Sequence, residues 1–273
     1  MDARLQRRVQ RYGWDKAAGF YETYWATQLV PAQSLRLNLA ALAPGERVVD
    51  VACGSGLVTF RAAAAVGPSG CVVGVDLSAE MVAIARESAS RQGLAHVTAE
   101  RMDAEELQLA DGAFDVALCA LGLMYVPDPR AALREMRRVL TPAGRAVVAV
   151  WGARKNCGWA EIFPIVDKRV ASEVCPLFFQ LGGGDALRVG MEASGFTDVT
   201  VERLSTTLHY ASADAACGAA FAGGPVALAY ARFDEAVRGE AHAEYLASIA
   251  PFKSGAGYAV PGEFVVARGA RAD

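Results

Sequence analysis

Apolar residues recur with two different periods along the 273 residues of this chain. Segments near 56–66, 79–92 and 128–140 carry the spacing of helices. Short apolar runs between them predict strands at 47–52, 71–76, 96–101, 114–121 and 145–151. Strands that alternate with helices in this way predict an α/β fold, in which helices cover both faces of a parallel sheet.

Less regular regions flank this alternation. Ahead of it we expect a short amphipathic helix over 4–12 and a further helix over 32–42, with an aromatic-rich segment between them. Behind it, the pattern predicts a helix over 185–194 and strands over 199–210 and 258–268. The intervening residues 211–257 are rich in alanine and glycine and read as an insertion.

Composition excludes several classes of protein. With 53% apolar residues the chain can bury a full core, and its net charge of −3 without a dominant basic run argues against tight nucleic-acid binding. Six cysteines without a C-x-x-C pair indicate neither a zinc site nor a disulfide framework. No secretory signal and no membrane span is expected, because the longest uncharged stretch, 215–231, is short and interrupted. We therefore expect a cytoplasmic protein.

A turn of small residues follows the first predicted strand. Asp50 closes the apolar run, and Gly54 and Gly56 precede a helix expected over 57–65. Asp76 ends the next apolar run, twenty residues after Gly56, where an acid can hold the hydroxyls of a ribose. The dinucleotide pattern G-x-G-x-x-G lacks its third glycine here, and Asp50 would repel a pyrophosphate but can pair with an ammonium group.

This turn resembles the first motif of the class I S-adenosylmethionine-dependent methyltransferases, D/E-x-G-x-G-x-G, with Ala52 in place of the first glycine. The resemblance implies S-adenosylmethionine as cofactor and a Rossmann-like sheet of seven strands. These strands are parallel except for an antiparallel one near the C-terminus, and helices cover both faces. It further implies N-terminal lid helices over 1–44 and a methyltransferase domain over 45–273, within a single structural domain.

Other family motifs follow between residues 45 and 152. By this resemblance Asp76 accepts hydrogen bonds from both ribose hydroxyls, Asp103 accepts one from the adenine amino group, and Met102 packs on the adenine ring. The loop after the fourth strand should border the methyl group, because ligands lie beyond the carboxyl ends of parallel strands. The expected cofactor site consists of Asp50, Ala52, Gly54, Gly56, Asp76, Leu77, Met81, Met102, Asp103 and Cys119.

The substrate pocket is expected where the lid meets that loop. Tyr21 and Trp25 are four residues apart and share a helix face, and Leu123, Met124 and Tyr125 follow the fourth strand. Ordinary packing of the helix is the alternative role for the two aromatic residues. The loop resembles that of the ubiquinone and menaquinone C-methyltransferases, G-[LI]-R-N, but Met124 replaces the arginine. This departure argues against quinone ring methylation and leaves the broader group of small-molecule methyltransferases.

The expected reaction is methyl transfer to a small, apolar or aromatic acceptor, with transfer to O or C favoured over N or S. Positioning can supply much of the rate enhancement. A base is needed only if the acceptor must lose a proton, and His209 is the candidate; Tyr125 is a second candidate catalytic residue, expected to contact the substrate. His96 and His242 are expected to be structural or solvated. No metal-ligand cluster is evident in the sequence, so a metal-independent reaction is expected.

Several alternatives stay open at this point. The insertion at 211–257 could cap the substrate side or form a homodimer surface. The fold could bind a nucleoside as a regulator or assembly subunit without turnover. An arsenite or thiol methyltransferase would use Cys157, Cys175 and Cys217, whose spacing matches no known ligand pattern. A nicotinamide oxidoreductase is disfavoured by the missing glycine.

Overall fold

The protein is described by a computed structural model that covers residues 3–170 and 178–272. Its strands are β1 (Arg47–Val51), β2 (Cys71–Asp76), β3 (Val97–Arg101), β4 (Phe114–Ala120), β5 (Leu140–Trp151), β6 (Phe196–Tyr210), β7 (Lys253–Ser254) and β8 (Gly257–Arg271). Its α-helices are α1 (Ala3–Trp25), α2 (Val30–Ala40), α3 (Thr59–Val66), α4 (Ala79–Arg91), α5 (Pro129–Val139), α6 (Ile162–Asp167), α7 (Ala186–Ala193), α8 (Ala213–Cys217), α9 (Ala227–Tyr230) and α10 (Glu235–Ser248). Short helical turns lie at η1 (Leu123–Tyr125), η2 (Arg154–Asn156), η3 (Gly218–Ala222) and η4 (Ala250–Phe252).

The strands form one sheet in the order β3-β2-β1-β4-β5-β8-β6, and β7 adds a short pairing to β8. The pairs of β1 with β2, β1 with β4, β2 with β3, and β4 with β5 are parallel, whereas β8 runs antiparallel to both of its neighbours. This topology confirms the predicted α/β fold with an antiparallel C-terminal strand. The strand order reverses between β1 and β4, and a ligand crevice is expected at such a switch point.

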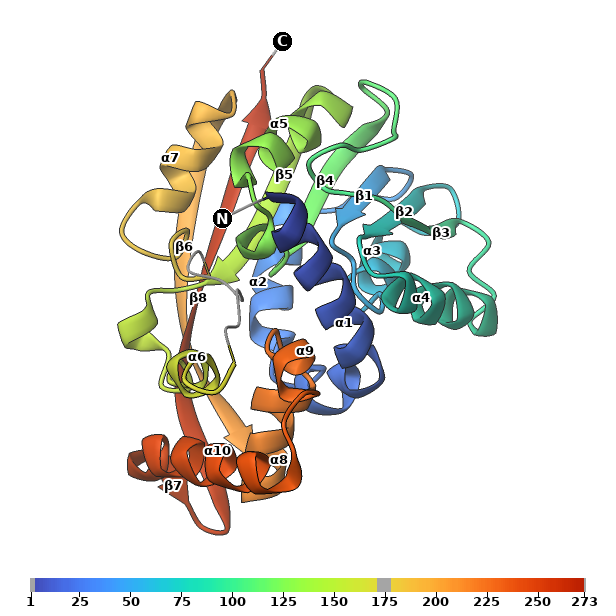
Figure 1. Ribbon diagram of the computed structural model, residues 1–273. Coiled ribbons are helices and arrows are strands. Elements are labelled where there is room, and N and C mark those ends of the chain that lie inside the picture. Colours follow the sequence, from blue (N-terminus) through green and yellow to red (C-terminus); the bar gives the residue numbers. More distant parts are fainter. Residues whose placement is uncertain (1–2, 171–177, 273) are drawn as a thin grey trace.

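Helices cover both faces of the sheet (Figure 1). Along β4, Val116 and Leu118 join the core formed with α2 and α3, whereas Ala117 and Cys119 join the core formed with α5 and α7. Successive side chains of a strand point to opposite faces, so this alternation places β4 between two apolar layers. The continuous apolar runs in the sequence arise from this double burial.

The N-terminal region differs from the sequence-based expectation. One helix, α1, replaces the short helix and the separate aromatic segment, and it continues through Gly13. A Cβ placed on Gly13 would lie 3.8 Å from that of Leu228, so this glycine packs closely against the neighbouring segment. Along its length α1 contacts α4, α9 and η3 (Figure 1). Tertiary contacts of this kind compensate for the low helix propensity of glycine.

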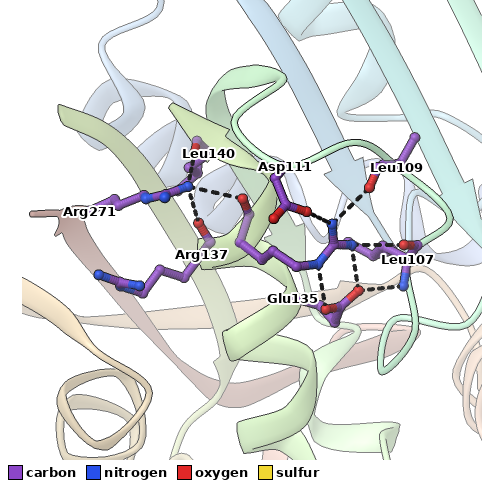
Figure 2. Close-up of polar contacts among 8 residues, drawn as sticks. Leu107, Leu109, Asp111, Glu135, Arg137, Leu140 and Arg271 are labelled. Carbon is purple, nitrogen blue, oxygen red and sulfur yellow. Dashed lines mark hydrogen bonds and ion pairs between the residues drawn. The ribbon is translucent and has the colours of Figure 1, made fainter. Parts of the chain in front are cut away.

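Arg138 fixes the loop between β3 and β4, and Arg271 fixes the end of the helix that carries Arg138. Arg138 on α5 donates to the carbonyls of Leu107 and Leu109, both at 2.8 Å, and pairs with Glu135 and Asp111. Arg271 near the end of β8 donates to carbonyls at the end of α5 and the start of β5 (Figure 2). This network holds the loop whose first residues reach the candidate site.

Candidate functional site

A cavity lies beyond the carboxyl ends of β1, β2 and β4, at the switch point of the sheet. It encloses about 780 Å³, part of it open to solvent. Two carboxylates, Asp76 and Asp103, lie in its wall, and we call it the carboxylate cavity. Its lining residues are Arg7, Gln10, Trp14, Tyr21, Val51, Ala52, Gly54, Val75, Asp76, Leu77, Met81, Met102, Asp103, Ala104, Ala120, Leu121, Gly122, Tyr125, Val126 and Pro127.

The turn after β1 forms the floor of this cavity. Ala52, Gly54 and Gly56 have φ angles of 57°, 57° and 97°, the left-handed region that favours glycine. A Cβ on Gly54 would meet nothing within 4 Å, so the turn leaves open space there. Ala52 keeps its methyl group because Gly122 has none: a Cβ on Gly122 would lie 2.2 Å from that of Ala52.

Asp76 is held by backbone donors from two turns, the one after β1 and the one before α4. Its Oδ2 accepts from the Gly54 N–H and its Oδ1 from the Ser78 N–H, each at 2.9 Å. Burial raises the pKa of this carboxyl to about 6, although the two backbone donors oppose the shift. A carboxylate has about four acceptor positions, so Asp76 retains acceptor capacity for a ligand.

Arg7 and Asp15 tie the helix α1 to the loops that follow β2 and β3, by polar contacts that the sequence analysis did not foresee. Arg7 lies 2.8 Å from Asp103 and 2.6 Å from Glu105. Asp15 accepts a hydrogen bond of 2.6 Å from Ser78, which also caps α4. Both contacts join α1 to loops that line the cavity.

A second cavity of about 420 Å³ adjoins the first at Ala52 and Gly54, and we call it the arginine cavity. Arg36 lines it with a side chain that is completely buried, and none of its three guanidinium nitrogens has a hydrogen-bond partner among the described residues. Asp50 lies behind Arg36, 3.6 Å away, and its other oxygen accepts from Thr59 at 2.7 Å. Burial raises the pKa of Asp50 and lowers that of Arg36.

A third cavity of about 360 Å³ is walled by rings, and we call it the aromatic cavity. Consecutive ring centroids lie 4.9–6.1 Å apart in the order Tyr21, Trp14, Tyr125, Phe178, Trp159, Trp151, Trp25. All seven line the cavity, together with Leu29, Leu121, Gly223, Gly224 and Pro225. Residues 223–225 belong to the segment expected as an insertion on the substrate side.

The structure brings together most of the predicted cofactor residues. Ala52, Gly54, Asp76, Leu77, Met81, Met102 and Asp103 line the carboxylate cavity. Asp50, Gly56 and Cys119 do not line it. Asp50 instead faces Arg36, a Cβ on Gly56 would meet the Phe60 ring at 2.6 Å, and Cys119 is buried in the core.

Some of the predicted substrate and catalytic residues line a cavity, and others do not. Tyr21, Trp25 and Tyr125 line the aromatic cavity, whereas Leu123 and Met124 are buried outside its lining. His209 is exposed on β6, where its backbone N–H donates to Gln28, and it lines none of the three cavities. The sequence analysis missed Arg7, Gln10, Arg36, Trp151, Trp159 and Phe178.

Cys157 and Cys217 are buried, and among the described residues no metal-binding group brings them together. Burial raises the pKa of Cys157 to about 11 and that of Cys217 to about 12, whereas Cys175 lies outside the described residues. Within residues 3–170 and 178–272 no group of three or more His, Cys, Asp or Glu side chains could hold a metal ion. No helix in the same ranges is long and apolar enough to cross a membrane.

Comparison with known proteins finds methyltransferases. Residues 42–164 match the family described as "Methyltransferase domain". Demethylmenaquinone methyltransferase of Bacillus cytotoxicus is 33% identical over 142 residues, which cover 52% of this chain and 58% of that protein. Nocamycin O-methyltransferase of Saccharothrix syringae is 34% identical over 131 residues, which cover 48% of this chain and 47% of that protein. The chain thus spans about half the length of these curated relatives.

Solved structures share the fold over more of the chain. The YcgJ protein from Bacillus subtilis aligns with a TM-score of 0.62 at 17% identity, and the alignment covers 89% of this chain and 99% of that one. At this identity the likeness shows the fold alone.

Proposed function

The chain contains a class I S-adenosylmethionine-dependent methyltransferase domain, and we propose that it transfers a methyl group from this cofactor to a small, neutral, apolar or aromatic acceptor. One observation carries the proposal: Tyr21 and Leu121 line all three cavities. A site for the nucleoside, a site for an amino-acid end and an apolar site therefore meet at one point.

The residues present fit the parts of the cofactor. Asp76 offers acceptors for the ribose hydroxyls, and Met102 and Asp103, which line the same cavity, would contact the adenine. Arg36 offers unpartnered donors to a carboxylate, which the arginine cavity would take from the methionyl end. Asp50 then acts through Arg36, as the buried counter-ion of that guanidinium, rather than by direct contact with an ammonium group.

When bound, S-adenosylmethionine supplies an electrophilic methyl group on its sulfonium. The task of the chain is then to hold the acceptor in line and to exclude water, and well-oriented reactants can gain roughly 7–11 kcal/mol from positioning. The rings of α1 and the turn η1 close the aromatic cavity around the acceptor. Burial raises the pKa of Tyr21, so this phenol stays neutral and orients the acceptor without removing its proton.

The lining of the aromatic cavity bears on the acceptor atom. Its described residues include no carboxylate, imidazole or amine that could serve as a base. We therefore favour an acceptor that ionises by itself near neutral pH or loses its proton after attack, such as an acidic enol, a phenol or an activated carbon. The name of the O-methyltransferase described above supports oxygen as the acceptor atom.

Calorimetric titration with S-adenosylhomocysteine tests the cofactor assignment. We expect micromolar binding that Asp76→Ala abolishes and that Glu87→Ala, which removes an exposed carboxylate of α4, leaves unchanged. Equal affinities of both variants would contradict the assignment. Transfer of a radiolabelled methyl group to a panel of phenols and cyclic β-diketones then tests turnover, and binding without transfer to any acceptor would favour a non-catalytic role.

A further inference from the structure

The outer face of α1 carries larger apolar side chains than its inner face. Between residues 3 and 20, the buried positions of this helix hold only glutamine, glycine and alanine: Gln6, Gln10, Gly13, Ala17 and Ala18. Leu5, Tyr12 and Phe20 point outward instead, and 40%, 46% and 50% of their surfaces, respectively, are exposed. A surface helix ordinarily turns its apolar residues toward the core. Packing against this chain therefore does not account for the outer face of α1.

Exposed apolar residues are concentrated at this helix. Among the described residues, four of the five large apolar side chains that are exposed lie on α1 or at the first position of α2: Leu5, Tyr12, Phe20 and Val30. The fifth, Val189, lies on α7. Figure 1 shows α1 in front of the sheet, on the outside of the molecule. Single exposed apolar residues are ordinary in proteins, whereas a group of them on one element indicates a binding surface.

Two cations lie among these apolar residues. Five exposed residues follow one another along α1 at intervals of three or four positions and form one stripe, which we call the outer stripe: Leu5, Arg8, Tyr12, Lys16 and Phe20. None of the five is acidic, and Arg8 and Lys16 form no ion pair with any residue that the structure describes. Of the two acids on α1, Asp15 is bonded to Ser78 and Glu22 lies beyond the stripe. The outer stripe therefore presents apolar groups together with positive charge.

A second copy of the chain fits the outer stripe poorly. Two helices that pair antiparallel about a two-fold axis at Tyr12 would set Arg8 of one copy against Lys16 of the other, and like charges in contact are destabilising. Nucleic acid fits poorly as well, because phosphates would bind the two cations but leave Leu5 and Phe20 in water. An anionic membrane surface accommodates both kinds of group, since apolar and aromatic side chains enter the headgroup region while cations bind the lipid phosphates.

We propose that the outer stripe docks the protein on an anionic membrane surface, with α1 lying in the plane of that surface. Leu5, Tyr12 and Phe20 enter the headgroup region, and Arg8 and Lys16 bind lipid phosphates. The binding is peripheral and reversible, because it depends on a few side chains of one helix. The inner side of the same helix lines the carboxylate and aromatic cavities, so docking brings the cover of both cavities to the lipid.

Sedimentation with vesicles tests this docking in the full chain. The vesicles contain either phosphatidylcholine alone or phosphatidylcholine and phosphatidylglycerol in equal parts. We expect the native protein to bind the anionic vesicles roughly 10- to 30-fold more tightly than the neutral ones, the effect of two cations at an anionic surface, and added salt should reduce this ratio. Arg8→Gln/Lys16→Gln should bring the ratio close to one. Leu5→Ser/Phe20→Ser should weaken binding to both kinds of vesicle by about tenfold or more.

Control variants remove the same groups elsewhere on the surface. Arg232→Gln/Lys253→Gln takes away two exposed cations outside α1. Val189→Ser, matched to Phe20→Ser, takes away an apolar residue of the same exposure. Both controls should bind vesicles as the native protein does, whereas Phe20→Ser should bind them more weakly.

No binding of the native protein to anionic vesicles, or an equal loss of binding in the control variants, would overturn the proposal. So would a dimer in sedimentation velocity that Leu5→Ser/Phe20→Ser separates, because the outer stripe would then bind a second copy. Binding to duplex DNA that Arg8→Gln/Lys16→Gln abolishes, without binding to vesicles, would assign the stripe to nucleic acid instead. Titration with S-adenosylhomocysteine verifies that each variant is folded, since no residue of the outer stripe lines the three cavities.

Discussion

The guanidinium of Arg36 lies 3.6 Å from the carboxylate of Asp50, and both side chains are completely buried. Among the residues that the structure describes, the guanidinium has no hydrogen bond and one Asp50 oxygen is also without one, so the pair is incomplete. An arrangement of this kind leaves donors available to a second carboxylate while Asp50 balances the charge. It is the geometry expected of a preorganised anion site.

Replacement of Arg36 should lower the affinity for ligands that carry a carboxylate and leave the affinity for other ligands unchanged. The single variant Arg36→Met should lose about 3–5 kcal/mol of stability, since it leaves Asp50 buried without a counter-ion. The double variant Arg36→Met/Asp50→Asn removes both charges and serves for binding. We expect its affinity for S-adenosylhomocysteine to fall about 10- to 100-fold.

The control ligand is 5′-methylthioadenosine, which lacks the amino-acid end. The double variant should bind it as the native protein does. A parallel loss of affinity for both ligands would mean that Arg36 supports the fold rather than the carboxylate.

Cofactor affinity should depend on pH through Asp76. The pKa of this carboxyl is raised to about 6, and the ionised form is the better acceptor for two ribose hydroxyls. As pH falls through 6 the group is protonated, so the dissociation constant should rise, approaching about tenfold per pH unit well below the pKa. Above pH 7 it should stay constant.

5′-Methylthioadenosine again isolates the effect, because it carries no group that titrates between pH 5 and 8. Asp76→Asn should bind it more weakly and without this pH dependence. A profile that is flat in the native protein would show that Asp76 does not hold the nucleoside.

Ala52 and Gly122 should behave as a coupled pair. Gly122→Ala places two methyl carbons 2.2 Å apart and should destabilise the protein by about 1–3 kcal/mol through overpacking. The backbone of Gly122 has φ −96°, which any residue adopts, so the clash with Ala52 is the principal cost. Ala52→Gly, which also relieves a left-handed φ, should restore the stability of the double variant.

Urea unfolding of the two single variants and the double variant measures this coupling. Additive effects would place the cost of Gly122→Ala elsewhere, for example at the Cys119 sulfur 3.3 Å away.

Arg7 should control the release of the cofactor. It joins α1 to the acidic residues of the opposite wall, so Arg7→Met should loosen this cover and raise the dissociation rate of S-adenosylhomocysteine several-fold. Added salt should raise the rate in the native protein and have less effect in the variant. Lys16→Met removes an exposed cation of the same helix and should leave the rate unchanged in stopped-flow measurements.

The fold and the floor of the site could be predicted because short, local sequence patterns determine them. Asp76, Met102 and Asp103 end or follow strands that the apolar runs mark, and parallel strands bring their carboxyl ends to one edge. Ser78 carries an equally local signal, since a serine ahead of a helical pattern indicates a cap, and it accepts from the Met81 N–H.

The walls contributed by distant segments could not be predicted in this way. Tertiary packing alone brings Trp151, Trp159 and Phe178 to the same cavity as Trp25 and Tyr125. No local sequence pattern indicates these contacts. Arg36 did carry a signal, because Ala32 and Ala40 lie one turn on either side of it and all three are buried. A cation on the buried face of a helix indicates a specific partner.

His209 shows the opposite case. Its neighbours Leu208 and Tyr210 are both buried, so the alternation of β6 turns His209 outward. Leu123 and Met124 follow the same logic in η1, where the tight turn directs Tyr125 to the cavities and buries the two residues before it. In both places the identity of the residue suggested chemistry that the local geometry does not support.

The continuity of α1 has a kinetic consequence. Arg7 and Gln10 near its start border the carboxylate cavity, Trp14 and Tyr21 border both the carboxylate and the aromatic cavity, and Trp25 at its end borders the aromatic cavity. One continuous helix thus covers both cavities, so a movement of this helix away from the sheet would open both at once. The methylated product and S-adenosylhomocysteine would then leave after the same opening step. Substitutions that weaken the packing of the helix should therefore raise both dissociation rates in parallel.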